Sequence, residues 1–158
     1  MKEDRKKEGL KIVSENRKAR HNYIIGDKFE AGIVLVGTEV KAIRLGRANL
    51  KDSYVKIKKG EAFVCQMHIG KYPFAFYENH DPLRTRKLLL NKNEIKRLYG
   101  KVNEKGFSLV PLRLYFKNGK AKLAIALARG KRKYDKREAI RKRDAKREMD
   151  RRRKEDMR

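Results

Sequence analysis

The chain has 158 residues, of which 41% are charged and 39% are hydrophobic, so it has room for one ordinary domain with a modest core. Lys and Arg outnumber Asp and Glu by 45 to 20, which gives a formal net charge of +25. A charge this large repels itself unless a polyanion neutralises it. Nucleic acid is the commonest such polyanion, because its phosphates release condensed counterions when lysines and arginines bind. An anionic membrane surface is the alternative.

Several classes of protein are disfavoured. No stretch is long and apolar enough to span a membrane, and the start, MKEDRKKEGLK, lacks the apolar centre of a signal peptide. The single cysteine, Cys65, excludes an internal disulfide and fits a reducing cytoplasm, where we expect the protein to act. One cysteine and three dispersed histidines form no metal-ligand pattern, and no glycine-rich phosphate loop occurs. We therefore expect no metal, no cofactor and no enzymatic activity.

The first part of the chain predicts a flexible start followed by a strand and a helical turn. Residues 1–11 are polar and basic without periodicity, and we expect them to be flexible. The segment NYIIGDKFEAGIVLVG, residues 22–37, predicts a long strand with a bend or bulge at Gly32. TEVKAIR, residues 38–44, predicts a helical turn for which Thr38 is a suitable N-cap.

The middle of the chain predicts two hairpins separated by a helix. SYVKIKKGEAFVCQMHIG, residues 53–70, alternates around a Lys-Gly turn. NKNEIKRLYGKV, residues 91–102, predicts the clearest helix, because Asn91 and Glu94 have the spacing of a capping box. The Asn-Gly pair at 118–119, between two apolar runs, is a strong hairpin signal. Together these elements predict a mainly β protein, an OB-like closed β-barrel with one or two short-to-medium helices.

The basic C-terminal tail, residues 131–158, differs from the barrel that we expect over residues 12–130. It contains 15 basic and 7 acidic residues, no glycine, no proline and too few apolar groups to offset the entropy of ordering, so we expect it to be disordered when free. Three acid-first i, i+4 pairs nevertheless favour a helix once the charge is neutralised. These pairs are Glu138/Lys142, Glu148/Arg152 and Asp150/Lys154.

One stretch before the barrel strands combines the residue types that bind RNA. ENRKARHNY, residues 15–23, brings guanidinium forks, an amide and an aromatic ring together, which suits phosphates, base edges and stacking on unpaired bases. A solvated basic loop explains the same stretch equally well. Tyr134 is harder to explain structurally, since an isolated aromatic ring in a basic tail has no core to join, and we expect it to stack or dock.

Five blocks of sequence stand out in order along the chain: NRKARHNYIIGDKFEAGIVLVGTEVKAIRLGRANLKDSYV, GEAF, DPLRTRKLLLNKNEI, LVPLRLY and GKRKYDKR. In this order they resemble the small protein B (SsrA-binding protein) family of bacteria, and the resemblance covers nearly the whole chain up to Arg137. It implies an OB-like barrel. It also implies a role in trans-translation, in which members bind transfer-messenger RNA (tmRNA) at its tRNA-like domain. They deliver it, with elongation factor Tu and GTP, to ribosomes stalled on messages without a stop codon.

The resemblance also implies two sets of contact residues. Those expected to contact tmRNA are Asn16, Arg17, Lys18, Arg20, His21, Glu30, Glu39, Lys41, Arg44, Leu89 and Lys122. Those expected at the ribosomal decoding centre are Lys131, Lys133, Tyr134, Asp135, Lys136 and Arg137. Two of the RNA-contact residues are acidic, and our hypothesis is that each carboxylate accepts hydrogen bonds from base or 2′-OH donors or holds an arginine in place.

In the family the tail is disordered when free and folds as a helix in the decoding centre and the empty mRNA channel. A fully helical tail would reach ~42 Å at about 1.5 Å per residue. Tyr134 stands where some members have histidine, so stacking is retained but a protonatable ring is lost.

Three interpretations remain. We expect a monomeric tmRNA-delivery protein whose partners are the tRNA-like domain of tmRNA, the small-subunit rRNA of the ribosome and, through the RNA, elongation factor Tu with GTP. A generic rRNA-binding or RNA-chaperone OB-fold protein would explain the charge and the barrel, and it would bind RNA without preference for sequence and with strong salt dependence. A membrane-surface protein is disfavoured, because the tail lacks Trp, Phe and Leu for an apolar face.

Overall fold

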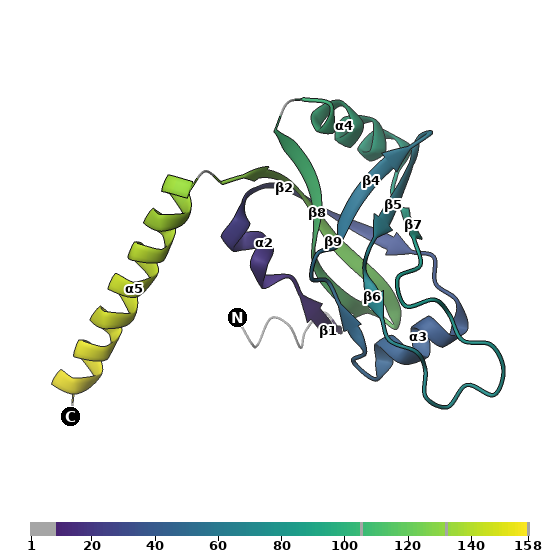
Figure 1. The fold of residues 1–158 in the computed structure, drawn as a ribbon, viewed down its shortest axis with the longest axis horizontal. Coiled ribbons are helices and arrows are strands. Elements are labelled where there is room, and N and C mark those ends of the chain that lie inside the picture. Colours follow the sequence, from purple (N-terminus) through teal and green to yellow (C-terminus); the bar gives the residue numbers. More distant parts are fainter. Residues whose placement is uncertain (1–8, 105, 132, 158) are drawn as a thin grey trace.

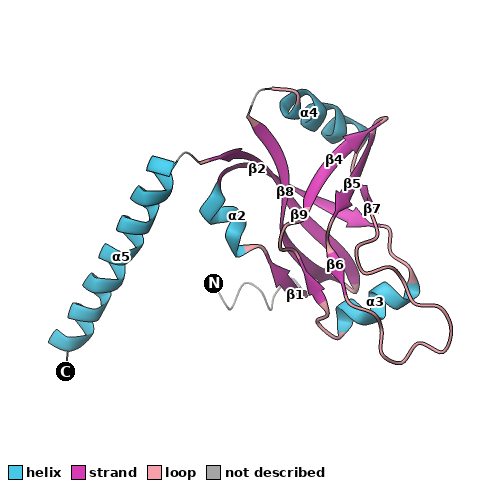
Figure 2. Cartoon of the chain, in the orientation of Figure 1, coloured by secondary structure: helices cyan, strands magenta, loops and turns pink. Residues whose placement is uncertain are grey.

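The computed structural model describes residues 9–104, 106–131 and 133–157. Its elements, in chain order, are β1 (Leu10–Glu15), α2 (Arg17–Asn22), β2 (Tyr23–Ile33), α3 (Gly37–Arg44), β3 (Ala48–Asn49), β4 (Tyr54–Lys58), β5 (Glu61–Cys65), β6 (His68–Ile69), β7 (Arg86–Leu89), α4 (Lys92–Val102), β8 (Phe107–Lys117), β9 (Lys120–Gly130) and α5 (Lys133–Asp156). Figure 1 shows the strands as one body, with α4 and α3 at opposite ends and α5 projecting from its side. The prediction of a mainly β fold is confirmed (Figure 2).

Antiparallel pairing closes the large sheet into a barrel. The strand order is β1-β8-β4-β5-β7-β2-β9, and β9 also pairs with β8, so six strands form a ring to which β1 is added. The long strand β8 makes this possible, because its first half reaches β4 at Leu109 while its second half pairs with β1. The OB-like closed barrel is therefore confirmed. The predicted helices are α3 and α4, and α2 is a further six-residue helix that the sequence did not predict.

The last strand shows how alternation builds two packing layers. In β9, Leu123, Ile125 and Leu127 belong to the main core inside the barrel. Ala126 and Ala128 point to the other face, where they pack in a smaller cluster that includes the buried residue of α2. Small side chains on that face let α2 lie close to the barrel wall, which is how a short basic helix becomes part of the domain.

Two β-bulges determine which side chains face outward. The register of β8 against β9 shifts between Pro111 and Arg113, and the shift reverses the inside-outside alternation of the strand. The register of β2 against β9 shifts between Ile25 and Lys28 and is regular from Lys28 to Gly32, so the β-bulge that we expected at Gly32 lies earlier in the strand. Gly32 instead allows a close approach between strands.

The predicted hairpins and the predicted helix cap are confirmed. Asn118 and Gly119 both have positive φ values, 51° and 78°, as a tight two-residue hairpin turn requires. At the start of α4, the backbone N–H of Asn91 donates to the Glu94 carboxylate at 3.2 Å. Residues within a few positions of one another were therefore sufficient to predict these elements.

Two expectations at element ends are wrong. β1 begins at Leu10, which pairs with Lys117, so residues 10 and 11 are not part of a flexible start; residues 1–8 lie outside the described residues. The partner strand lies about a hundred residues away in sequence, and local composition cannot reveal it. Thr38 is not the N-cap of α3 either, because the helix begins at Gly37 after Val36.

The tail forms the helix α5 over most of its length. Two of the predicted ion pairs are present, Glu138 with Lys142 at 3.3 Å and Glu148 with Arg152 at 2.9 Å. The third predicted pair, at 150 and 154 within the described part of the tail, forms no ion pair. The helix is the conformation that we expected for the bound tail, and disorder of the free tail stays a prediction.

Candidate nucleic-acid interface

Asn16, a predicted RNA contact, is the N-cap of α2. Its side-chain oxygen accepts from the backbone N–H of Ala19 at 3.2 Å, and its side-chain NH2 donates to the carbonyl of Pro111 at 3.0 Å. Its backbone N–H also donates to the carbonyl of Leu112, at 2.8 Å. These carbonyls belong to the bulge of β8. Asn16 therefore anchors α2 to the barrel, and its amide is largely occupied within the protein.

The basic side chains of α2 are displayed by this anchor. Arg17, Lys18 and Arg20 are exposed, as expected for residues that bind phosphates. His21 is half-buried, and its Nδ1 is buried without a hydrogen-bond partner among the described residues. Contact between His21 and RNA is therefore limited to the exposed part of the ring.

A hollow on one side of α2 gathers positive charge from four elements. It measures about 350 Å³, and its charged lining residues are Glu15, Arg17, Arg20, Lys28, Arg113 and Arg143. The single carboxylate among them, Glu15, pairs with Arg113 at 3.2 Å. The remaining guanidinium and ammonium groups have no counter-charge in the lining. The hollow is therefore strongly cationic, which suits a phosphate-rich strand.

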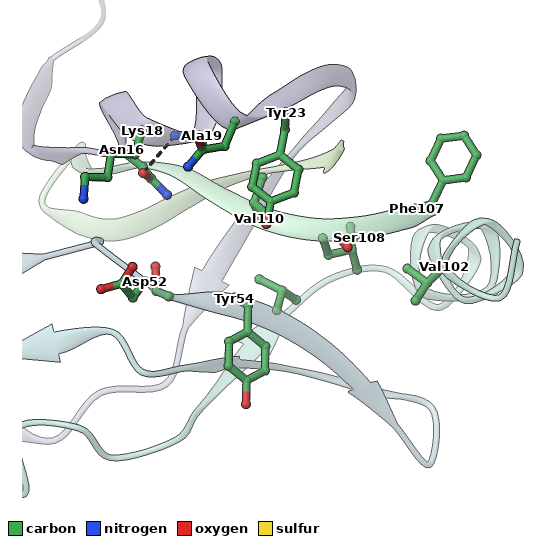
Figure 3. Close-up of a pocket in the computed structure, with 14 residues that line it drawn as sticks. Asn16, Lys18, Ala19, Tyr23, Asp52, Tyr54, Val102, Phe107, Ser108 and Val110 are labelled. Atoms are coloured by element: carbon green, nitrogen blue, oxygen red, sulfur yellow. Dashed lines mark hydrogen bonds between the residues drawn. The ribbon is translucent and has the colours of Figure 1, made fainter. Parts of the chain in front are cut away.

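A second hollow, on the other side of α2, is less charged. It measures about 490 Å³ and lies between α2 and the start of β4. Figure 3 shows Lys18 and Tyr23 at the α2 side, Asp52 and Tyr54 at the β4 side and Phe107 at the far end. The predicted contact Lys18 thus lies on the opposite flank of α2 from the cationic hollow.

Glu30 projects from the outer face of β2. Its carboxylate accepts a hydrogen bond from the hydroxyl of Tyr115 and lies 3.7 Å from the ammonium of Lys117. Burial raises the pKa of Tyr115 above its usual value, and the bond to Glu30 adds to this shift, so the phenol stays protonated as a donor. Tyr115 therefore holds the Glu30 side chain in place on an otherwise basic surface.

Glu30, Leu89 and Lys122 lie together, although they come from three strands. Gly32 pairs with Leu89 on one side and with Lys122 on the other, and Glu30 is two residues away on the same face of β2. A Cβ at position 32 would lie 3.2 Å from the Cβ of Leu89, so glycine is what allows the Leu89 side chain to sit there. Leu89 and Lys122 line one hollow of about 330 Å³, and Glu30 and Leu89 line another of about 460 Å³.

The α3 residues adjoin this face. Lys41 and Arg44 are both exposed. Val40 of the same helix lines the hollow that contains Leu89 and Lys122. α3 therefore extends the strand face at one end of the barrel.

Glu39 does not lie on the surface and cannot touch RNA. Its side chain is fully buried, and it pairs with Arg86, which is also fully buried, and with Arg84. Burial alone would raise the pKa of Glu39, but hydrogen bonds from Arg84, the Val36 N–H and Arg86 outweigh it, and the net pKa lies below the usual value. Direct contact by Glu39 is thus a wrong expectation, whereas the alternative in our hypothesis, a carboxylate that holds arginines in place, matches the geometry.

The predicted decoding-centre residues begin where β9 meets α2. The backbone N–H of Lys131 donates to the carbonyl of Asn22 at 3.0 Å, and its ammonium donates to the carbonyl of Arg20 at 3.1 Å. Lys136 and Arg137 lie in the first turns of α5. The side chains of Lys133, Tyr134 and Asp135 lie outside the described residues.

Some residues of this surface were not predicted. Lys28 and Arg113 line the cationic hollow, and Tyr115 holds Glu30. The bulges of β2 and β8 decide that these residues face outward, and a strict period of two does not reveal them. The described residues contain no group of three His, Cys, Asp or Glu side chains that could hold a metal ion. None of the described helices has both the length and the apolar character needed to cross a membrane.

Comparison with known proteins gives consistent matches over most of the chain. A family described as "SmpB protein" matches residues 13–155. The SsrA-binding protein of Symbiobacterium thermophilum is 60% identical over 141 residues, which are 89% of this chain and 89% of that protein. The SsrA-binding protein of Shouchella clausii is 56% identical over 148 residues, 94% of this chain and 95% of that protein.

A solved structure agrees with the fold. It is described as "tmRNA-SmpB: a journey to the center of the bacterial ribosome", and its matched chain is 48% identical in sequence, with a TM-score of 0.65. The match covers 80% of this chain and 93% of that chain. At this identity the agreement extends beyond the barrel architecture to the sequence that builds it.

Proposed function

The chain belongs to the SmpB protein family, and we propose that it binds tmRNA (SsrA RNA) at the tRNA-like domain and delivers it to stalled ribosomes for trans-translation. The observation that carries this proposal is the identity of 55–60% to SsrA-binding proteins over 85% or more of the chain. The matched family region, residues 13–155, spans both the barrel and nearly all of α5.

We assign RNA binding to the outer face of the barrel. The cationic hollow beside α2 binds phosphates, since its guanidinium groups form bidentate hydrogen bonds with phosphate oxygens. The strand face with Glu30, Leu89 and Lys122 provides one acceptor, one apolar contact and one cation within a small area. Such a mixture discriminates a shaped RNA from a generic polyanion, because only the cation contributes to non-specific binding.

We assign ribosome contact to the tail, residues 131–158. α5 has 24 residues and therefore a length of ~36 Å at about 1.5 Å per residue, and its surface is charged all round. Such a helix gains little by packing on protein and suits a channel with rRNA walls, namely the decoding centre and the empty mRNA channel. In this proposal elongation factor Tu with GTP associates through the RNA, the protein acts as a monomer in the cytoplasm, and it catalyses no reaction itself.

The first test compares RNAs. The full chain is titrated with the tRNA-like domain of tmRNA, an ordinary tRNA and an unrelated hairpin across a salt series. A preference for the tRNA-like domain that persists at high salt supports a shaped interface. Equal binding that weakens in parallel for all three RNAs would identify a generic RNA-binding protein instead.

Single variants assign that binding to the outer face. Lys122→Ala should weaken binding to the tRNA-like domain, whereas Lys96→Ala, an exposed lysine of α4, serves as the charge-matched control. If the two variants weaken binding equally, the outer face has no special role.

The second test separates the barrel from the tail. Truncation after Lys131 keeps the two hydrogen bonds from that residue to α2 and removes one of the five cations of the cationic hollow, Arg143. It should therefore leave RNA affinity nearly intact while abolishing ribosome rescue. Truncation after Gly130 removes those bonds and serves as a test of whether they support α2. Loss of RNA binding in the protein truncated after Lys131 would contradict the assignment of RNA binding to the barrel and ribosome contact to the tail.

A further inference from the structure

The loop between β6 and β7 carries three aromatic side chains that are almost unburied. The exposed fractions are 69% for Phe74, 97% for Phe76 and 95% for Tyr77, whereas the core of this protein buries its large apolar residues almost completely. A cluster of large apolar side chains in water is unfavourable unless something covers it, and such clusters mark interaction sites. We call residues 71–80 the aromatic loop.

The base of the aromatic loop is fixed by side-chain hydrogen bonds. The side chain of Asn79 accepts from the backbone N–H of Tyr72 at 3.1 Å and donates to the carbonyl of Tyr72 at 2.9 Å. These two hydrogen bonds join the beginning and the end of the loop. His80 is buried, with one ring nitrogen 2.9 Å from the Thr38 hydroxyl and the other 2.9 Å from the carbonyl of Ile69. The exposed tip is therefore presented by an ordered frame.

The buried Glu39–Arg86 pair supports the same frame. Arg86 donates to the carbonyl of Pro82 at 3.2 Å as well as to Glu39, which lies on α3. A second arginine, Arg84, links Glu39 to this segment from the solvent side. The position of the aromatic loop relative to α3 thus depends on Glu39.

The charges near the aromatic loop favour an anionic partner. The ammonium of Lys41 lies 5.5 Å from the centroid of the Tyr72 ring, which in turn stands edge-on to Phe74. Arg44, three residues after Lys41 on α3, is exposed, and so is Arg47, whose backbone carbonyl accepts from the N–H of Gly70 just before the loop. One acidic residue of the loop, Glu78, opposes them. Aromatic rings next to a row of cations are the combination that binds unpaired nucleotides, since bases stack on rings while cations meet phosphates.

We propose that the aromatic loop is a second RNA-contact element, in which Phe74, Phe76 and Tyr77 stack on unpaired bases while Lys41 and Arg44 bind the adjoining phosphates. The inference rests on the RNA-binding function proposed above and adds a contact that the outer strand face does not supply. It also gives Glu39 a role as a positioning residue, because Glu39 holds the loop and α3 together.

A tryptophan reporter detects stacking directly. The chain contains no tryptophan, so Phe76→Trp creates a single fluorophore at the tip, and Tyr99→Trp on the exposed face of α4 is the matched control. Both variants are titrated with the tRNA-like domain and with a short single-stranded oligoadenylate. Stacking predicts strong quenching of the Phe76→Trp signal by both RNAs and little change in the control. An unquenched Phe76→Trp signal in the RNA complex overturns the proposal.

Alanine variants measure how much the aromatic loop contributes to the affinity for the tRNA-like domain. The triple variant Phe74→Ala/Phe76→Ala/Tyr77→Ala should bind the tRNA-like domain about 5- to 150-fold more weakly, the range expected for losing stacking on one base. Its salt dependence should match that of the wild type, because no cation is removed, whereas Lys41→Ala should lower the salt slope by about one. Tyr99→Ala is the control for aromatic loss, and circular dichroism checks the fold of each variant.

The outcomes separate this inference from the proposed function. Selective binding of the tRNA-like domain by the wild type, together with unchanged affinity of the triple variant, overturns the role of the aromatic loop alone. If ribosome rescue is then still lost, the loop contacts a protein instead. Quenching by oligoadenylate without any preference for the tRNA-like domain supports stacking and contradicts the proposed function.

Discussion

Replacing Glu39 with glutamine should destabilise the barrel by about 3–5 kcal/mol, the usual consequence of breaking a buried ion pair. The carboxylate accepts hydrogen bonds from Arg84 at 3.1 Å and from the Val36 N–H at 3.0 Å, besides its bond with Arg86. Arg86 is fully buried, so loss of the negative charge leaves a guanidinium without a counter-charge in the core. The glutamine NH2 would also face guanidinium donors, and one acceptor would be lost.

The effect is large relative to the stability of a domain of this size. Total stabilities are about 5–15 kcal/mol, and each 1 kcal/mol shifts Tm by about 2–4 °C in domains of 150 residues or more. We therefore expect the Tm of Glu39→Gln to fall by roughly 10 °C, measured by circular dichroism and by urea denaturation. Glu61→Gln is the control, because its pair with Lys87 is about half-exposed and should contribute less than about 1 kcal/mol.

A double variant distinguishes a missing counter-charge from general disruption. Glu39→Leu/Arg86→Met removes both charges and should recover part of the stability lost in Glu39→Gln, although the carbonyl of Met67 loses the Arg86 donor and that of Pro82 keeps only the Ile69 N–H. A Glu39→Gln protein within 1 kcal/mol of the wild type, or a double variant less stable than the single one, would refute this reasoning.

The remaining predictions concern pH, the tail and Glu30. The pKa of Glu39 is lower in the folded than in the unfolded protein, so its stabilising contribution is complete above the unfolded pKa and is lost as the pH falls through the folded pKa. The urea midpoint of the wild type should therefore fall more steeply on acidification than that of Glu39→Gln. Parallel curves for the two proteins would contradict this. A peptide of residues 132–158 should be mostly coil by circular dichroism at physiological salt, and a stable helix in water would exclude folding upon docking. Glu30→Gln should lower affinity for the tRNA-like domain about tenfold, since a charge-assisted hydrogen bond is lost, and unchanged affinity would remove the acceptor role.

The surface residues show where interpretation of the sequence failed and why. By sequence alone Glu30 and Glu39 are equivalent, since both are acidic residues at positions that the family resemblance links to RNA binding. One of them projects beside Tyr115 on the outer face, and the other is fully buried between two arginines. Burial depends on what packs over a side chain, and here that is a segment about 45 residues further along the chain.

The helix α2 also depends on a distant part of the chain, and here the local sequence failed to predict an element that is present. Its stretch was consistent with a solvated loop, because its six residues contain one apolar residue, Ala19. The helix exists because Asn16 caps it and bonds to carbonyls exposed by a bulge in β8, 95 residues away. No local signal predicts that partner.

The sequence by itself determined the charge, the family, the two hairpins and the capped helix α4, because these depend on composition or on residues within a few positions of one another. The tertiary structure alone decided which side chains share a surface. Bulges in β2 and β8 turn Lys28, Glu30 and Arg113 outward, and ring closure through β8 and β9 brings Lys122 beside Leu89. The physical reason is that strand register and burial depend on partners distant in the chain, so the RNA-binding surface forms only when the barrel closes.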